Sequence, residues 1–172
     1  TLVEQVKRLN TITPDGEVIY KVEQPYKPTG GLRVLGGNLS PDHSAVLKLA
    51  GVESGLEDNV FSGNARVFDS EQELLMALDT SPNKFENLDM IIVRYEGPMG
   101  APGMPEFLDP TSRITTLCRD RKIVLGLMTD ARFSGGSVGL VIGHVGPEAA
   151  LGGPIGLVQD GDQIVVDLNK NQ

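Results

Sequence analysis

The residues best suited to chemistry lie in the glycine-rich stretch RFSGGSVGLVIGHVGPEA, residues 132 to 149. Ser134 precedes the pair Gly135–Gly136, so its hydroxyl would lie on a tight turn beside backbone N–H groups. This arrangement suits a nucleophile, a base or an anion-binding loop, although a serine next to glycines is also ordinary turn chemistry. The stretch lacks the G-x-S-x-G pattern of hydrolases because Arg132 takes the place of the first glycine. No spacing pattern connects His144 with Ser134.

A second polar loop, EGPMGAPGMPEFLD, offers carboxylates. Glu106 follows a proline and precedes a predicted helix, and a carboxylate held in this way suits a hard metal ion such as Mg²⁺. Glu96 has a similar position, and both glutamates could equally be solvated loop residues. Arg132 could bind a substrate carboxylate through its planar guanidinium, or it could pair with Asp130 or Glu148.

Two apolar strands are expected to position these loops. MIIVRY, residues 90 to 95, and KIVLGLMTD, residues 122 to 130, are typical of strands buried on both faces. A helix is predicted between them, with Asp109 as its N-cap and Pro110 at its first position. One face of this helix would carry Ile114, Leu117, Cys118 and Arg121.

Such a strand–helix–strand unit has parallel strands, and binding sites form outside the carboxyl ends of parallel strands. The two polar loops both leave such ends. They are therefore expected to emerge close together and to line one pocket, with a small anionic molecule as its occupant.

The remaining segments complete a mixed α/β domain from residue 31 to residue 172. Strands are predicted in GLRVLGGN and AVLKLAG, and a strand and a helix with a Ser70–Glu73 capping box in NARVFDSEQELLMALDT. Pro147 is expected to begin a short helix, PEAAL, and GGPIGLVQDGDQIVVDL to form a hairpin around an Asp-Gly turn. Residues 1 to 30 are expected to form a short helix, TLVEQVKRLN, and an extended arm.

The composition narrows the class of partner. The 172 residues carry a net charge of −8, which argues against nucleic acid, since phosphates bind clustered lysine and arginine. No apolar run approaches the roughly 18 residues that a membrane span requires. The single cysteine, Cys118, can neither form an internal disulfide nor hold an iron–sulfur cluster by itself. A reducing compartment, the cytoplasm, is the simplest expectation.

Taken together, the motifs resemble those of the dihydroxy-acid and phosphogluconate dehydratase family. The segments that carry the resemblance are KPTGGLRVLGGNLSP, GNARVFDSEQE, YEGPMGAPGMPE and TDARFSGGSVGLVIGHVGPEAALGGPIGLVQDGDQI, in the order that the family keeps. RFSGGS and GHVGPEA favour the dihydroxy-acid dehydratase branch, which serves isoleucine and valine biosynthesis. Phosphogluconate and other sugar-acid dehydratases are the near alternatives.

The resemblance implies a C-terminal swivelling β/β/α domain, with a barrel-like sheet flanked by helices. The family's larger N-terminal domain, with the cluster cysteines and further Mg²⁺ ligands, is expected to be missing from this chain, so the chain alone is expected to be inactive. By resemblance, Ser134 is the presumed catalytic base and Glu106 a presumed Mg²⁺ ligand. The substrate is expected to contact Arg132, Gly135, Gly136 and Ser137.

The implied reaction dehydrates a 2,3-dihydroxy carboxylate to a 2-keto acid. Mg²⁺ would hold the carboxylate and the C2 hydroxyl, Ser134 would remove the C2 proton, and the cluster iron would accept the C3 hydroxyl. The full enzyme is expected to be a homodimer.

Two other classes of protein remain open. One is a non-catalytic module that binds a small anion or a docking partner. The other is a serine hydrolase, and this alternative predicts that an acylating probe labels Ser134.

Overall fold

The computed structural model describes residues 16–28, 30–49 and 55–172. The chain separates into two compact units, Thr1–Gly30 and Gly31–Gln172. The described residues of the first unit form bends and turns, and the helix expected for residues 1–10 lies outside the described residues. No helix in the described ranges is long and apolar enough to cross a membrane.

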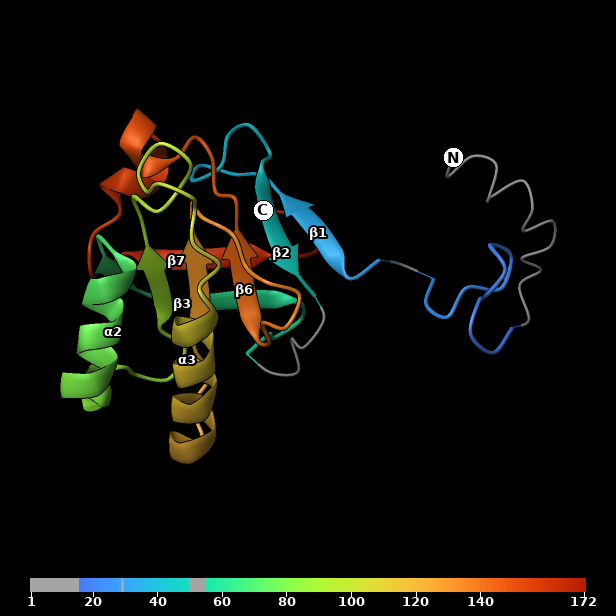
Figure 1. Ribbon diagram of the computed structural model, residues 1–172, viewed down its shortest axis with the longest axis horizontal. Helices are drawn as coiled ribbons and strands as arrows, with labels where there is room; N and C mark the ends of the chain where they lie inside the picture. Colours follow the sequence, from blue (N-terminus) through green and yellow to red (C-terminus); the bar gives the residue numbers. More distant parts are fainter. Residues whose placement is uncertain (1–15, 29, 50–54) are drawn as a thin grey trace, which may run out of the picture. The chain divides into compact units, whose positions relative to one another are not determined.

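The second unit is built on one curled sheet of seven strands, flanked by helices (Figure 1). The strands are β1 (Leu32–Leu35), β2 (Ala45–Lys48), β3 (Val60–Phe68), β4 (Met90–Val93), β5 (Gly126–Thr129), β6 (Leu140–Gly143) and β7 (Gln163–Asp167). The helices are α2 (Glu71–Thr80) and α3 (Leu108–Arg121), with short 3-10 helices η1 (Pro82–Lys84), η2 (Ala149–Leu151) and η3 (Pro154–Leu157).

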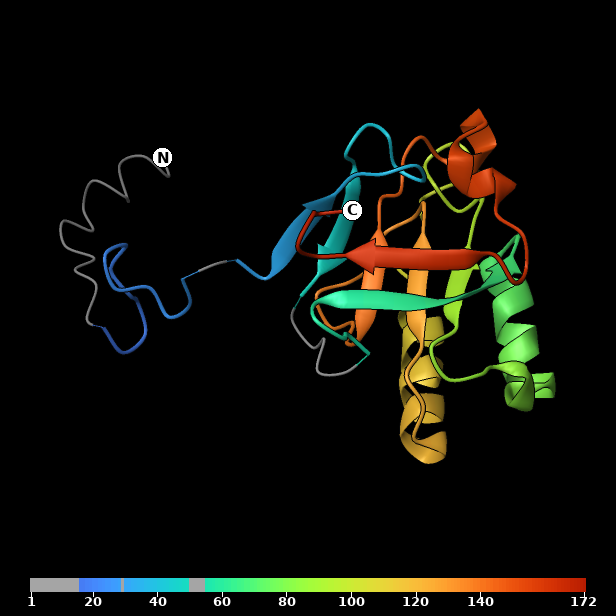
Figure 2. The ribbon, with the colours of Figure 1, turned by 180° about the vertical axis from the view of Figure 1, so that it is seen from behind.

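The sheet has a parallel centre and antiparallel ends. Its strand order is β1-β2-β6-β5-β4-β3-β7, with β6, β5, β4 and β3 parallel. The long strand β3 pairs with β7 through its first half and with β4 through its second half, so it turns the sheet back on itself. Seen from behind, β3 and β7 cross steeply over the direction of the central strands (Figure 2). The sheet is therefore a half-barrel, which confirms the mixed α/β, barrel-like fold.

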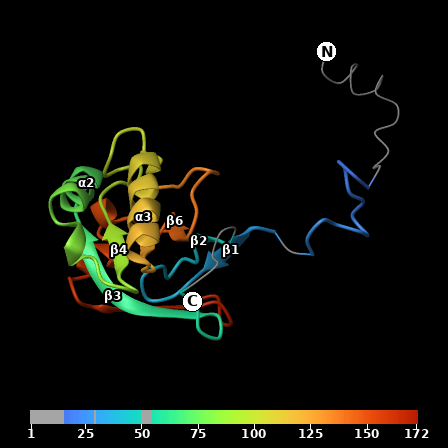
Figure 3. The ribbon, with the colours of Figure 1, turned by 90° about the horizontal axis from the view of Figure 1, so that it is seen from below.

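Side chains alternate along the central strands between two cores. In β4, Met90 and Ile92 pack inside the curl, whereas Ile91 and Val93 pack toward the helices. Both α2 and α3 lie on the outer face of the sheet, as the view from below shows (Figure 3). Each buried aliphatic side chain contributes about 1.5–3 kcal/mol, so the continuous apolar runs predicted from the sequence stabilise both layers.

The predicted strand–helix–strand unit is present as β4, α3 and β5, with β4 and β5 parallel and in direct register. Half of the predicted capping box at α2 is present, since the Glu73 N–H donates to the Ser70 hydroxyl at 3.2 Å. The glutamate side chain accepts instead from the N–H of Asp69, one residue before the N-cap, at 2.9 Å.

The predicted N-cap of α3 is wrong. The helix begins at Leu108, and its N-cap is Phe107, a buried residue in the left-handed region with φ of 54°. Packing of the Phe107 ring decides where the helix starts. Asp109 lies inside the first turn, where its carboxylate accepts from the Arg113 guanidinium at 2.8 Å.

The predicted C-terminal hairpin is also wrong. Its first arm forms the 3-10 helix η3, and β7 pairs with β3 instead. Pro154 has no N–H to donate to a strand partner. The Arg94 guanidinium binds the carbonyl oxygens of Gly156 and Val158, at 2.7 and 2.9 Å, which holds this segment at the end of β4. The short helix expected from Pro147 begins only at Ala149, as η2.

Candidate active site

Three backbone segments meet at the carboxyl ends of the parallel strands around one buried carboxylate, Asp130. Its side chain is 3% exposed and accepts from the N–H groups of Tyr95 and Glu96, each at 3.1 Å, and of Ala149 at 3.0 Å. Asp130 follows β5, the first two donors follow β4, and the third follows β6. This carboxylate therefore fixes the starts of the loops after β4 and β5 relative to the segment after β6.

A second buried carboxylate, Glu148, holds the loop after β4 from the other side. It accepts from the Met99 N–H at 3.0 and 3.1 Å and from the Gly100 N–H at 3.3 Å. A Cβ on Gly97 would lie 2.1 Å from the Glu148 carboxylate, so this approach requires glycine. The glycines of YEGPMG thus let the backbone wrap around an anionic side chain.

Glu96 was a candidate metal ligand on sequence grounds, but it is buried at the start of α2. Its carboxylate accepts from the Glu71 N–H at 2.7 Å, where a negative charge stabilises a helix N-terminus. Burial raises the pKa of Glu71, and the nearby Glu96 and Asp109 carboxylates raise it further. The contacts of Glu96 among the described residues therefore indicate that it stabilises the start of α2.

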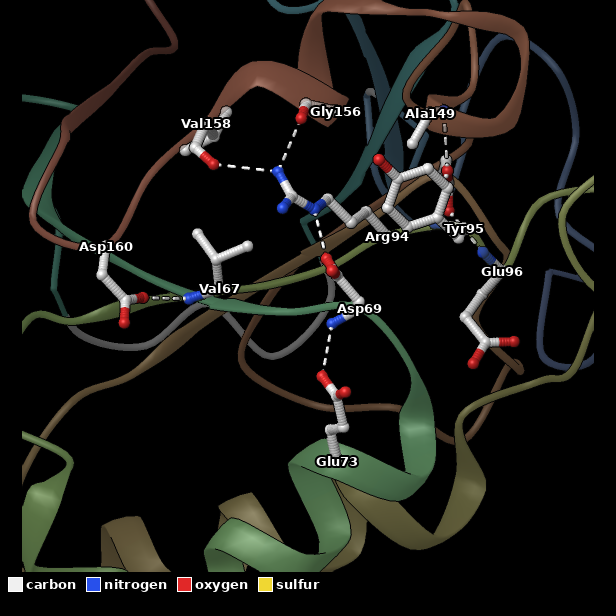
Figure 4. Close-up of polar contacts among 11 residues, drawn as sticks. Val67, Asp69, Glu73, Arg94, Tyr95, Glu96, Ala149, Gly156, Val158 and Asp160 are labelled. Atoms are coloured by element: carbon white, nitrogen blue, oxygen red, sulfur yellow. Dashed lines mark hydrogen bonds and ion pairs between the residues drawn. The ribbon is translucent and has the colours of Figure 1, made fainter.

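Arg94 connects the ends of β3 and β4 with η3 (Figure 4). Its Nε donates to the Asp69 carboxylate at 2.5 Å, and its guanidinium carbon lies 5.5 Å from the centre of the Tyr95 ring. Tyr95 itself takes a left-handed conformation, with φ of 65°. Asp130 on one side and Arg94 on the other hold this strained residue in place.

The loops that carry Glu106 and Ser134 come together, and Arg132 joins them. Its guanidinium lies 3.5 Å from the Glu106 carboxylate, and its Nε donates to the Met104 carbonyl oxygen at 3.1 Å. Both side chains of the ion pair are half-exposed, at 46% and 41%. Arg132 pairs with neither Asp130 nor Glu148, the two partners that the sequence suggested.

An aromatic contact lies between the two candidate residues. The rings of Phe107 and Phe133 meet edge to face, with their centres 5.9 Å apart. Glu106 immediately precedes one ring and Ser134 immediately follows the other. Phe107 is buried, so this ring contact sets the spacing between the loop that carries Glu106 and the loop that carries Ser134.

The serine turn lies farther from the sheet edge than the parallel-strand argument expects. Since β5 and β6 are parallel and no helix joins them, residues 130–139 must run back along the sheet to the start of β6. Within this connection the Ser137 N–H donates to the Ser134 carbonyl oxygen, and the Gly136 N–H donates to the Ser134 hydroxyl, each at 3.3 Å. The Ser137 hydroxyl is buried and has no hydrogen-bond partner among the described residues.

Sequence reasoning missed Lys48, on β2. Its ammonium donates to the carbonyl oxygens of Ser134, at 3.4 Å, Ser137, at 2.5 Å, and Gly135. Burial alternates along β2, with Ala45 and Leu47 in the core inside the curl, so Lys48 lies on the outer face of the sheet. No local sequence pattern connects it with a turn 86 residues away.

The described residues offer few ligands for a metal ion. No group of three or more histidine, cysteine, aspartate or glutamate side chains among them could hold a metal ion. Cys118 packs against the helix-side core, where burial raises the pKa of its thiol. The packed Cys118 thiol is therefore unsuited to bind an iron–sulfur cluster. The carboxylate of Glu106, in contrast, is exposed enough to contribute one ligand to Mg²⁺.

A cavity of about 320 Å³ lies inside the curl of the sheet, lined mainly by apolar side chains that include Leu35, Met128, Ile142 and Ile164. None of the predicted site residues lines this cavity. The candidate site is thus the surface formed by the two outer loops.

The fold and the site together define a mixed α/β half-barrel domain with a serine turn, an arginine and a carboxylate on one face. The chain belongs to the dihydroxy-acid/6-phosphogluconate dehydratase C-terminal family, whose model matches residues 17–172.

Similar proteins are named dihydroxy-acid dehydratase. One from Agathobacter rectalis is 48% identical over 98% of this chain and 28% of its own length. One from Pyrococcus furiosus is 49% identical over 91% of this chain and 27% of its own length. The mitochondrial enzyme of Saccharomyces cerevisiae is 43% identical over the whole chain and 28% of its own length. The chain thus spans less than a third of the relatives that it matches.

Proposed function

We propose that this chain is the C-terminal part of a hydro-lyase that dehydrates 2,3-dihydroxy carboxylates to 2-keto acids. The observation that carries the proposal is the junction of the Ser134 and Glu106 loops through Arg132, in a chain of the dehydratase family. A base and a metal-binding carboxylate on neighbouring loops are what removal of a proton next to a carboxylate requires.

In this proposal the Ser134 oxygen, as an alkoxide, removes the proton from C2 while the C–O bond at C3 breaks. The departing hydroxide takes that proton from the serine and leaves as water, and the enol product tautomerises to the 2-keto acid. The Gly136 N–H, which donates to the Ser134 hydroxyl at 3.3 Å, favours the negative charge that the oxygen must carry. Arg132, Gly135, Gly136 and Ser137 bind the substrate.

Glu106 contributes one ligand to a Mg²⁺ ion whose other ligands come from outside this chain. Mg²⁺ and an iron–sulfur cluster would supply Lewis-acid stabilisation of the carboxylate and of the leaving hydroxyl in the complete enzyme. Arg132 keeps Glu106 oriented toward the serine loop when no ion is bound. The further partners are a cluster-binding domain of the same enzyme and a second copy in a homodimer, and the expected compartment is the cytoplasm.

The substrate is the feature that most needs a direct test, since the family name covers two dehydratases. The complete enzyme, loaded with its metals, should be assayed in parallel with 2,3-dihydroxyisovalerate and 6-phosphogluconate. The RFSGGS and GHVGPEA motifs predict preference for the first substrate. A clear preference for 6-phosphogluconate would support the alternative, a sugar-acid dehydratase.

Replacement of the proposed base tests the mechanism. Ser134→Ala in the complete enzyme should abolish turnover, because no other group takes the C2 proton, while Mg²⁺ and cluster contents stay unchanged. Ser112→Ala, an exposed serine in α3, is the matched control and should keep wild-type turnover. Near-normal turnover in Ser134→Ala would refute the role.

A further inference from the structure

Lys48 reaches the serine turn from a different part of the sheet. It is the last residue of β2 and stands opposite Val141, near the start of β6. The two strands are neighbours in the sheet (Figure 1). Its neighbour Leu47 faces the core inside the curl, so Lys48 points to the outer face, where the 130–139 connection crosses β6.

The ammonium of Lys48 uses its full donor capacity on one turn. A lysine ammonium has three N–H donors, and the three acceptors are the carbonyl oxygens of Ser134, Gly135 and Ser137. In residues 16–28, 30–49 and 55–172, no carboxylate lies within ion-pair distance of Lys48. Its positive charge therefore acts on the turn without a paired anion.

We propose that Lys48 is a positioning residue for Ser134, an inference that rests on the proposed dehydratase function. Backbone carbonyls that point at the ammonium fix the peptide planes on both sides of Gly135. The N–H groups of the same peptides then point away from the lysine, and the Gly136 N–H meets the Ser134 hydroxyl. Lys48 thus orients both the serine oxygen and the amide that supports it.

The turn has few other restraints. Gly135 and Gly136 are both exposed, and a Cβ on Gly135 would contact nothing within 4 Å. Two adjacent glycines have wide conformational freedom, so without an external contact the turn would sample several conformations. A base displaced by about 1 Å loses on the order of 100-fold in rate, which makes restraint of this turn a requirement for turnover.

The test compares Lys48→Met and Lys48→Arg in the complete, metal-loaded enzyme. Lys48→Met should lower kcat by about 10- to 100-fold and change KM less, because the turn that carries the base loses its restraint, whereas Arg132 and Glu106, which Lys48 does not contact, keep their proposed roles in holding the substrate and Mg²⁺. Lys48→Arg retains a cation that can donate to carbonyl oxygens, and it should recover most of kcat. Lys84→Met, an exposed lysine in η1, is the matched control and should match the wild type.

Hydrogen exchange supplies a measurement that needs no activity. Amides of residues 133–139 should exchange faster in Lys48→Met than in the wild type and at wild-type rates in Lys48→Arg. Unchanged exchange, or faster exchange with wild-type kcat, would overturn the proposal. A full-length wild type that dehydrates neither substrate would refute the proposed function instead, and exchange would then still show whether Lys48 orders the turn.

Discussion

The proposed base is a serine, whose hydroxyl is protonated at neutral pH and is a weak base when unassisted. Its surroundings must therefore stabilise the charged form, and the Gly136 N–H, which donates to the Ser134 hydroxyl at 3.3 Å, is placed to do so. This differs from a serine hydrolase, in which a histidine takes the proton, and His144 makes no hydrogen bond to Ser134 in the part of the chain that the structure describes.

Cys118 supplies a residue-scale prediction about pH. Burial raises the pKa of its thiol, so at a given pH the folded chain holds less thiolate, the reactive form. Alkylation by iodoacetamide should be slower in the native chain than in urea at pH 8, and the native rate should rise only at higher pH. Equal native and unfolded rates across the pH range would contradict an inert, packed cysteine.

Elements position the site through buried carboxylates. Asp130 and Glu148 accept backbone N–H groups from segments that follow β4 and β6, so loops that are separate in sequence become one structure. Hydrogen bonds to charged acceptors are stronger than those between neutral groups, which lets glycine-rich loops keep one conformation. Gly97 allows this close approach, since a Cβ at that position would lie 2.1 Å from the Glu148 carboxylate.

Asp130→Asn tests this role at the scale of the loops. The asparagine amide brings a donor to a place where three N–H groups point, so at least one is left unpaired in a buried site. We expect a loss of about 2 kcal/mol in the free energy of unfolding, measured by urea denaturation. Asp120→Asn, exposed at the end of α3, should change stability by less than about 0.5 kcal/mol. Equal stability of the two variants would show that Asp130 is not the organising acceptor.

At the scale of the whole molecule, the domain carries only part of the proposed site. The described residues offer a single candidate metal-binding carboxylate, Glu106, and single carboxylates bind Mg²⁺ weakly. The inside of the curl holds a cavity of about 320 Å³, but its lining is mainly apolar and lacks the predicted site residues. The proposed reaction therefore needs metal-binding groups beyond those of the described residues.

The chain by itself should be inactive. Purified alone, it should show no dehydration of 2,3-dihydroxyisovalerate and only millimolar affinity for Mg²⁺ in isothermal titration calorimetry. The positive control is the complete enzyme in the same buffer. Turnover by the isolated chain, even at low rate, would mean that the base and one metal ligand suffice, contrary to the division of the site proposed here.

Local sequence patterns were sufficient to predict several secondary-structure elements of this protein. Continuous apolar runs predicted β4 and β5, and the Ser70–Glu73 spacing predicted the start of α2, because both depend on residues a few positions apart. The start of α3 could not be predicted in this way. Asp109 has the ordinary chemistry of an N-cap, but the burial of Phe107 against Phe133, 26 residues away, sets the first turn.

By itself the sequence determined the parallel unit, the two polar loops that leave it and the candidates Ser134, Glu106 and Arg132, since these follow from periodicity and from side-chain type. Only the tertiary structure decided that Arg132 pairs with Glu106, that Glu96 supports α2, and that Lys48 lies against the serine turn. The physical reason is that such contacts depend on how the sheet curls and where the connection between β5 and β6 crosses it. Neither property is encoded in any short run of residues.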